Sequence, residues 1–393
     1  MRSIGAGVAV TAAIVIAAVN LRPALITVGP LLPAIAHTLA LNTPAIATVS
    51  ALPIVVLGAV SPFAYRFSAL AGLSGTMLGA QVAIALGILL RSSGTVAGLI
   101  AGSVLLATGI GLGNALLPAL IKLRFPNAVG RLMGIYTMSL TIGAATGAAI
   151  TPLLVQRAGG DWRSALAWWA IPATLAAILW IPMARTRERA RSAAPGASPW
   201  HSRTGWFVSL FMGVQSAYFY SLVAWLGVLF QARGMSLVEA GVNLTFFYIV
   251  QIGGAFLGPV VIVRAKHQGV AIAVTMLVCL AATTACLFAP ATIVWLAAAI
   301  VGLCLGAIFG CALTFMVVRA RDASTSARLS GMSQCVGYLL AGLGPLLIGL
   351  IHTSGAVLIG SEIVLCAIGL LIMVFGFLAG RPRFVEDDVP LAA

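Results

Sequence analysis

The sequence predicts an all-α membrane protein with twelve transmembrane helices in two pseudo-symmetric six-helix halves. Three observations lead to this prediction: an apolar composition, twelve apolar runs long enough to cross a bilayer, and an internal repeat. Of the 393 residues, 61% are hydrophobic and 8% are charged, and the mean hydropathy is +1.11. A soluble chain of this length could not bury so much apolar surface, so a membrane location is expected.

The apolar runs form two sets of six. A helix needs about 20 predominantly apolar residues to cross the hydrocarbon core. The first set comprises residues 8–34, 45–65, 72–90, 95–121, 130–154 and 163–183. The second set comprises residues 205–230, 237–263, 269–289, 292–318, 328–351 and 356–379. The polar segment between the sets is rich in arginine, serine and proline, as is typical of a solvated linker.

These runs define the expected domains. They are a first six-helix bundle at 1–183, a cytoplasmic linker at 184–204, a second bundle at 205–380 and a cytoplasmic tail at 381–393.

The two halves also repeat in sequence. A shift of 197 residues places Gly109, Gly113, Ala115 and Leu116 on Gly306, Gly310, Ala312 and Leu313. The same shift places Lys122, Arg124 and Arg131 on Arg319, Arg321 and Arg328, and chance identity does not readily explain basic residues in register. Two parallel six-helix repeats that hold substrate between them are the architecture of major facilitator transporters.

Basic residues are distributed unevenly between alternate loops, and lysine and arginine are enriched in loops that face the cytoplasm. One side holds seventeen of them: Arg2, Arg66, Lys122, Arg124, Arg131, Arg185, Arg187, Arg189, Arg191, Arg203, Arg264, Lys266, Arg319, Arg321, Arg328, Arg381 and Arg383. The other side holds four: Arg91, Arg157, Arg163 and Arg233. We therefore expect both termini and the linker to be cytoplasmic.

Arg22 belongs to neither side, because it lies in the middle of the run at 8–34. A charge at the bilayer centre costs at least about 2.5 kcal/mol on insertion scales. Arginine does not lose its proton in proteins. We therefore expect Arg22 to face a cavity and to bind an anionic or polar substrate. The alternative is that it only joins helices through backbone carbonyls.

The helix around Arg22 is expected to be broken. Pro23 cannot donate to the carbonyl of Val19, and Pro30 and Pro33 follow. A kink and freed carbonyls suit a helix that lines a cavity. Asn20 either lines the same cavity or forms a hydrogen bond to a neighbouring helix.

A polar and aromatic stretch lies at the position that the repeat aligns with Arg22. Gln215, Tyr218, Leu222 and Trp225 recur at spacings of three and four, so they share one helix face. Tyr220 lies in the same stretch. We expect Gln215, Tyr218, Tyr220 and Trp225 to contact substrate, with packing as the alternative.

Five further polar residues are candidates either for substrate binding or for hydrogen bonds between helices: Asn114, Tyr136, Gln251, Gln334 and Tyr338. Five glycines are expected to permit close helix contact rather than to bind substrate: Gly143, Gly147, Gly337, Gly342 and Gly344.

Several functions are excluded by the sequence. The net charge of +14 sits in the gaps between apolar runs, with no basic face that would bind nucleic acid. Gly72–Gly75 matches the serine motif of intramembrane proteases, but the histidines lie in loops or at helix ends, where no base can serve a nucleophile. The six cysteines form no CxxC pair. We expect no enzyme, metal or cofactor.

Three stretches, Asn20–Leu32, Gly113–Lys122 and Gln215–Leu226, resemble the cyanate permease and nitroimidazole transporter family of the major facilitator superfamily. The resemblance covers both halves. It implies a multi-pass transporter of the bacterial inner membrane that moves small anions or small polar organic molecules. The loop at Gly58–Phe67 departs from the superfamily pattern because it lacks an acidic residue, and Gly227 stands where proline usually follows Trp-Leu.

We therefore expect a secondary transporter that works by alternating access, with substrate held between the halves near Arg22. Its substrate is cyanate-like or nitroimidazole-like. The alternatives are a multidrug or metabolite exporter of the same fold, or an anion channel. The expected partners are a small-molecule substrate and the lipid bilayer, around a monomer. Energy coupling stays open: no acid lies at a helix centre, and the candidate proton sites are Glu239, Glu362, His37 and His352.

Overall fold

The computed structural model describes residues 2–185, 198–352 and 357–388, and their regular structure is helical. Two compact units form. Unit 1 contains Met1–Arg124 and Ser139–Ser192, and unit 2 contains Phe125–Met138 and Ala193–Ala393. The helix α7 (Val129–Arg157) therefore contributes residues to both units.

The predicted fold class is confirmed. In the described part of the chain, 11 helical stretches are long and apolar enough to cross a membrane. One of them, Pro44–Arg91, holds two successive helices, α4 (Thr43–Val60) and α5 (Ala64–Arg91), so the stretches correspond to the twelve predicted spans.

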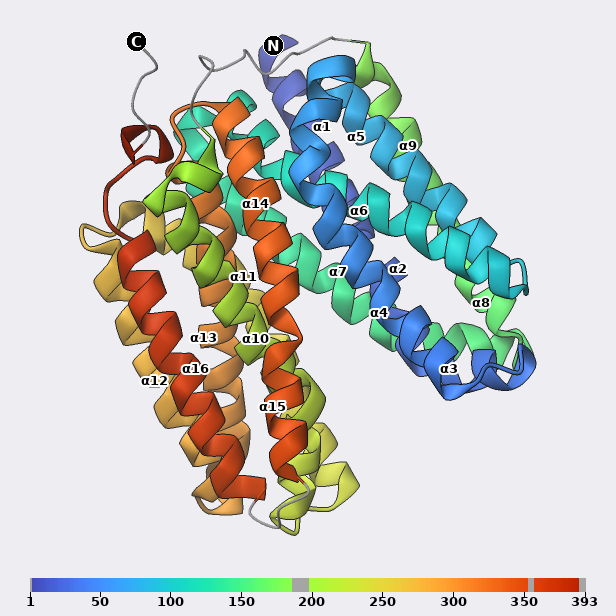
Figure 1. Ribbon diagram of the computed structural model, residues 1–393, viewed down its shortest axis with the longest axis vertical. Helices are drawn as coiled ribbons and strands as arrows, with labels where there is room; N and C mark the ends of the chain where they lie inside the picture. The colour runs from blue at the N-terminus through green and yellow to red at the C-terminus, as the bar shows by residue number, and fades with distance from the viewer. Residues whose placement is uncertain (1, 186–197, 353–356, 389–393) are drawn as a thin grey trace. The chain divides into compact units, whose positions relative to one another are not determined.

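Unit 1 is built around α6 (Val96–Arg124), which adjoins both α4 and α5 (Figure 1). The other elements of its spans are α1 (Arg2–Asn20), α2 (Pro23–Ile26), α3 (Val28–Thr38), the short helix η1 (Ser61–Phe63), α8 (Trp162–Ala167) and α9 (Ala170–Ala184).

Three glycines allow α6 to pack closely on three neighbours. An added Cβ at Gly109 would lie 2.4 Å from the Ala80 carbonyl oxygen of α5, and one at Gly111 would lie 3.0 Å from that of Leu57 in α4. A Cβ at Gly113 would lie 2.8 Å from the Leu21 side chain, just after α1. The glycine-rich run is therefore a packing device, because side chains at these positions would push the three neighbours away.

The start of the third span differs from the prediction. We expected a loop at Gly58–Phe67 and a helix from residue 72, but η1 joins α4 directly to α5, which begins at Ala64. The helix is kinked at Gly72, where φ is +76°. Glycine adopts this conformation without steric cost. Hydropathy alone missed the first turns of α5 because they are less apolar than the rest.

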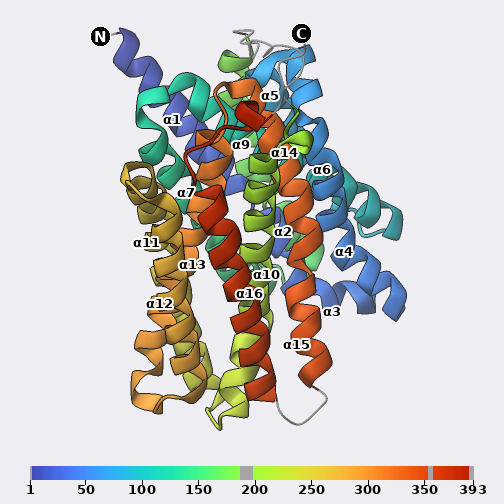
Figure 2. The same ribbon diagram turned by 60° about the vertical axis from the view of Figure 1, so that its left-hand side comes forward.

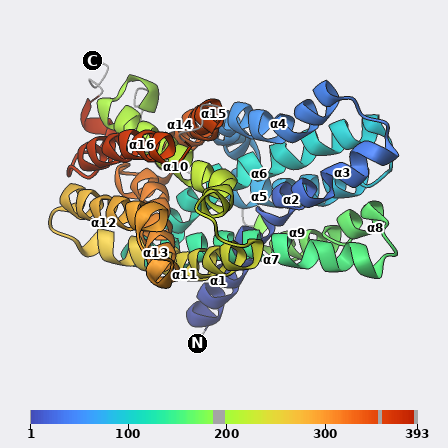
Figure 3. The same ribbon diagram turned by 90° about the horizontal axis from the view of Figure 1, so that it is seen from below.

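Unit 2 contains the spans of the second half. They are α10 (Arg203–Ala232), α11 (Leu237–Arg264), α12 (Gln268–Phe288), α13 (Ala291–Val318), α14 (Ala323–Ala341), α15 (Leu343–His352) and α16 (Val357–Ala379). The short helices η2 (Pro126–Ala128), η3 (Pro199–His201) and η4 (Val385–Asp388) complete it. Figure 2 shows α16 running beside α10, and Figure 3 shows α13 between α11 and α12.

The tail after α16 folds back onto unit 2. Asp388 accepts hydrogen bonds from the Ser202 hydroxyl at 2.8 Å and from the Thr204 N–H at 2.7 Å, at the start of α10. The Val385 N–H donates to the Arg319 carbonyl at 2.9 Å, and Arg321 pairs with Asp387. Much of the predicted linker, at 186–197, lies outside the described residues.

The expectation that glycines mediate close helix contact is confirmed at four of the five positions. A Cβ at Gly143, Gly147, Gly337 or Gly344 would lie 2.2, 2.9, 3.0 or 2.3 Å from its neighbour, respectively. The expectation is wrong for Gly342, where nothing lies within 4 Å. This residue ends α14 at the break before α15, so it supports a helix end rather than a contact.

Candidate substrate site

The first membrane span breaks at Arg22, as predicted. The helix α1 ends at Asn20, and Arg22 is the N-cap of α2, with Pro23 in the first helical position. Proline suits this position because its missing N–H needs no partner there. The Arg22 carbonyl accepts from the Leu25 N–H at 3.1 Å and the Ile26 N–H at 3.3 Å. The side chain of Arg22 is half-buried.

A second break follows at Thr27, where α2 ends and α3 begins. Pro30 has no N–H to donate to the carbonyl of Ile26, the last residue of α2, so the break lies where this proline predicts it, whereas Pro33 is accommodated within α3. The segment that follows Arg22 is therefore one short turn of helix between two joints.

Other helices of unit 1 hold this broken region in place. A Cβ at Gly143 of α7 would lie 2.2 Å from the Val19 carbonyl oxygen, and one at Gly147 would lie 2.9 Å from the Pro23 Cα. The α7 backbone therefore touches the chain on both sides of Arg22, and Arg22 sits at a fixed location in unit 1.

Asn20 and Asn114 are the other candidates in unit 1. The Asn20 side-chain amide donates to the Ile16 carbonyl at 3.2 Å and to the Pro172 carbonyl of α9 at 2.9 Å. This is the interhelical bond that was the alternative for Asn20. Asn114 is buried on α6, directly after the glycine that receives Leu21. Asn114 therefore follows directly after Gly113, the residue that contacts Leu21 at the break of the first span.

The remaining eight candidates lie in unit 2. Tyr136 is buried on the part of α7 that packs on α11, where the neighbouring Thr137 hydroxyl donates to the Ala255 carbonyl. Gln251 lies one turn before Ala255 on α11 and is also buried. The residues around both candidates thus serve helix packing.

The polar and aromatic stretch of α10 divides between different neighbours. The Tyr218 hydroxyl is bonded to the Thr283 hydroxyl of α12 at 2.8 Å, and the Trp225 indole N–H donates to the Pro345 carbonyl of α15 at 3.0 Å. The Gln215 amide donates to its own helix, at the Met212 carbonyl and the Ser216 hydroxyl. Tyr220 is half-buried and stacks edge-on against Phe219.

Gln334 and Tyr338 are one turn apart on α14. The Gln334 side-chain oxygen is buried and has no hydrogen-bond partner in the described structure. The neighbouring Ser333 is bonded to Ser209 of α10 at 2.9 Å, and Tyr338 is half-buried. Gln334 therefore has an unused acceptor inside unit 2.

Arg91 is buried in unit 1, which was not expected from the sequence. We expected Arg91 to be a loop charge, and this is wrong: only 2% of it is exposed. It is the last residue of α5, and its Nη1 donates to the Ala24 carbonyl of α2 at 2.8 Å. The position of Arg91 at the end of an apolar run hid its role, because hydropathy does not tell which way a terminal side chain turns.

The loop before α8 carries a carboxylate at the same end of unit 1. The Ser164 hydroxyl, followed by the backbone N–H groups of Arg163 and Ser164, lowers the pKa of Asp161 by hydrogen bonding to its charged form. Asp161 is the N-cap of α8. The Asp161 carboxylate therefore caps the N-terminus of α8 through its hydrogen bonds.

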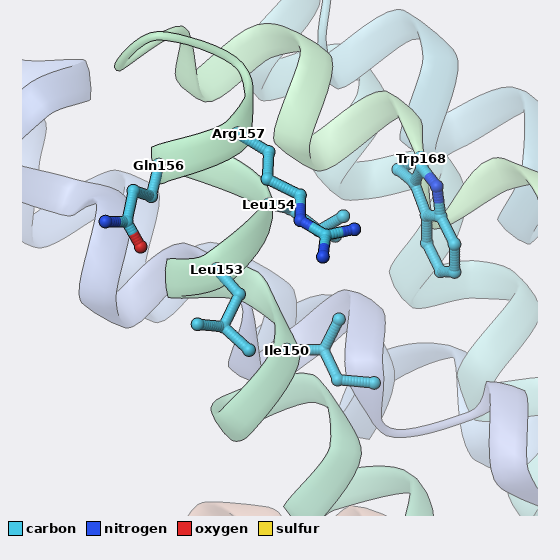
Figure 4. A pocket seen from close by; sticks show the side chains of 6 residues that line it. All are labelled: Ile150, Leu153, Leu154, Gln156, Arg157 and Trp168. Atoms are coloured by element: carbon cyan, nitrogen blue, oxygen red, sulfur yellow. The ribbon is translucent and has the colours of Figure 1, made fainter.

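A pocket of about 440 Å³ lies where α7 approaches the start of α9 (Figure 4). Ile150, Leu153, Leu154, Gln156, Arg157 and Trp168 line it. Two of these side chains, Leu153 and Trp168, are exposed apolar ones. No predicted site residue lines this pocket.

Twelve apolar spans and an arginine held at a break in the first of them define a polytopic membrane transporter. The Major Facilitator Superfamily model matches residues 8–345, and the chain belongs to this superfamily. Its members are transporters and not enzymes, as predicted.

Three relatives match nearly the whole chain. It is 33% identical to the uncharacterised transporter YycB of Bacillus subtilis, over 95% of this chain and 93% of the relative. It is 32% identical to the 2-nitroimidazole transporter of Escherichia coli, over 95% and 96%. It is 30% identical to the cyanate transport protein CynX of Escherichia coli, over 93% and 96%. The resemblance found in the sequence is confirmed.

The fold is also that of a solved transporter. The proton:xylose symporter XylE superimposes with a TM-score of 0.76 over 97% of this chain and 98% of that one, at 11% identity. At this identity the likeness concerns the fold alone.

Proposed function

We propose that this protein moves a small anion across the bacterial inner membrane by alternating access, and that Arg22 binds the anion directly. The observation that carries the proposal is the position of Arg22. A permanently charged, half-buried guanidinium sits between α1 and α2 in a membrane span that is broken twice. A planar fork of N–H donors binds a carboxylate or a cyanate-like anion better than an ammonium group does.

The relatives support a small substrate. One is named for cyanate and another for 2-nitroimidazole. Cyanate is a small anion, and a nitro group offers two acceptor oxygens to the same guanidinium. A neutral nitro-heterocycle is therefore the second candidate, supported by the similar identity of the two relatives.

Transport by the purified protein in proteoliposomes distinguishes these substrates. Uptake and efflux of radiolabelled cyanate, formate and 2-nitroimidazole are measured with and without a pH gradient. We expect saturable exchange of at least one small anion. If only 2-nitroimidazole is transported, the substrate is the neutral nitro-heterocycle and not a small anion. Ohmic currents in a planar bilayer would indicate a channel.

The role of Arg22 is tested by Arg22→Lys. The lysine keeps the charge but loses the fork, so we expect the apparent affinity for the transported anion to fall by about 10- to 100-fold, as for the loss of one charge-assisted hydrogen bond. The measurement is the substrate concentration that half-saturates transport in proteoliposomes, compared between the variant and the wild type. Equal responses of Arg22→Lys and the wild type would make the arginine structural.

We further propose that both termini are cytoplasmic, that the bundles are divided at the linker 184–204, and that the protein acts as a monomer. The bias of basic residues between alternate loops supports the orientation. Cysteines introduced by Ser92→Cys and Ser198→Cys should be labelled from opposite sides of the membrane. Labelling of both from the periplasm would refute this orientation.

A further inference from the structure

Arg91 is a buried cation with an unused hydrogen-bond donor. It is 2% exposed, its Nη1 donates to the Ala24 carbonyl, and its Nε is buried without a partner in the described structure. A buried donor of this kind is normally satisfied by protein, water or a bound ligand. Because the group is charged, leaving it unsatisfied is especially unfavourable.

Unit 2 provides an internal comparison. Arg319 is the other buried arginine of the described residues, at 6% exposure. It donates to the carbonyls of Ala379 and Gly380 and to the Gln268 side chain. A structural arginine in this protein is thus surrounded by acceptors, whereas a single acceptor is provided for Arg91.

The charge of Arg91 is not balanced by a neighbouring carboxylate. In the described residues of unit 1, Asp161 is the one acid, and its oxygens accept from the Arg163 N–H and from Ser164. Arg163 itself lies against Gly94, three residues after Arg91, and adds positive charge. Since arginine does not become neutral, no carboxylate in the described part of unit 1 balances this charge, and an anion at the unused donor would do so.

The position of Arg91 is fixed by backbone packing. A Cβ at Gly102 of α6 would lie 2.4 Å from the Arg91 nitrogen and 2.8 Å from its Cα. This close approach holds the end of α5 while the side chain reaches α2. The guanidinium is therefore preorganised, so a ligand that binds there does not bear the entropic cost of immobilising this side chain.

We propose that Arg91 binds a small monovalent anion through its unused donor, forming a second anion site in unit 1. Arg22 precedes α2, and Arg91 holds the second residue of that helix. Arg22 and Arg91 thus both adjoin one four-residue segment, Arg22 through its backbone carbonyl and Arg91 through its guanidinium. The site itself follows from Arg91 alone; only the identification of its anion with the transported substrate rests on the proposed function.

Anion-dependent thermal unfolding of the purified full chain tests the site. Formate and cyanate are titrated against gluconate at constant ionic strength, for the wild type, Arg91→Gln, Arg91→Lys and Arg157→Gln. Arg157 is the matched control because it is an exposed arginine of unit 1. We expect saturable stabilisation of the wild type and of Arg157→Gln. The apparent affinity of Arg91→Gln should be weaker by about tenfold or more, with Arg91→Lys between them.

Equal responses of the wild type and the Arg91 variants would overturn the proposal, as would a wild-type response that does not saturate. If Arg91→Gln does not fold, Arg91→Lys alone decides. The test is separable from that of Arg22, since Arg22→Gln should retain the anion response at Arg91 even when transport is lost. Loss of the response in Arg22→Gln but not in the Arg91 variants would assign the anion to Arg22 only.

Discussion

Gly143 offers the sharpest test of how the broken first span is held. A methyl group at this position would lie 2.2 Å from the Val19 carbonyl oxygen and 3.1 Å from the Val19 Cα, two backbone atoms. Ordinary contact begins at 3.4 Å, so α1 or α7 would have to move by more than 1 Å. Overpacking of this kind costs about 1–3 kcal/mol.

Replacement of a helical glycine by alanine also stabilises the folded state, by about 0.5–1 kcal/mol, through its effect on backbone entropy. The substitution Gly79→Ala in α5 measures this entropic gain without a steric cost, because nothing lies within 4 Å of a Cβ at that position. We therefore expect Gly79→Ala to be slightly more stable than the wild type and Gly143→Ala to be less stable. Gly147→Ala should lie between them, since its Cβ would be 2.9 Å from the Pro23 Cα.

The assay is thermal unfolding of the three purified variants, combined with transport in proteoliposomes. The difference between Gly143→Ala and Gly79→Ala isolates the steric cost, at about 2–4 °C for each kcal/mol in a unit of this size. Transport should fall in the same order, because the shift occurs beside Arg22. A Gly143→Ala variant as stable and as active as Gly79→Ala would refute the close packing of α7 on the first span.

Three further predictions concern unit 2. Burial opposes the ionisation of Asp388, but hydrogen bonds from Thr204 and Ser202 outweigh it and lower its pKa. Its stabilising effect is therefore complete above about pH 4 and is lost as the pH falls through the lowered pKa, so unfolding temperatures measured against pH should decline more steeply for the wild type than for Asp388→Asn. Tyr218→Phe should lose about 0.5–1.5 kcal/mol of stability and keep its substrate affinity, because Thr283 still bonds to the Cys279 carbonyl; a selective loss of affinity would instead return Tyr218 to the substrate site. Glu239→Gln and Glu362→Gln should each retain a substantial part of transport at neutral pH, since Glu239 is exposed in a capping box and Glu362 accepts from the Thr284 hydroxyl; loss of all proton-driven accumulation in either variant, with exchange preserved, would identify a proton site.

The number of spans and the break at Arg22 could be predicted from the sequence because both depend on local chemistry. The length of an apolar run decides whether a helix can cross the bilayer, and a proline at position 23 leaves a carbonyl four residues earlier without its helical donor. Packing at the glycines of α7 was also predictable, because a missing side chain is the usual means of close approach in a membrane.

The partners of the polar side chains could not be predicted in this way. Tyr218 and Trp225 share a helix face by spacing, yet their hydrogen bonds go to α12 and α15. Arg91 stands at the end of an apolar run, where an outward turn into water and an inward turn towards α2 have the same sequence pattern. Lipid tails and protein side chains are equally apolar, so hydropathy determines which segments enter the membrane but not which helix lies beside which. The position of a buried charged side chain is decided only by the tertiary packing, through contacts such as that of Gly102 with Arg91.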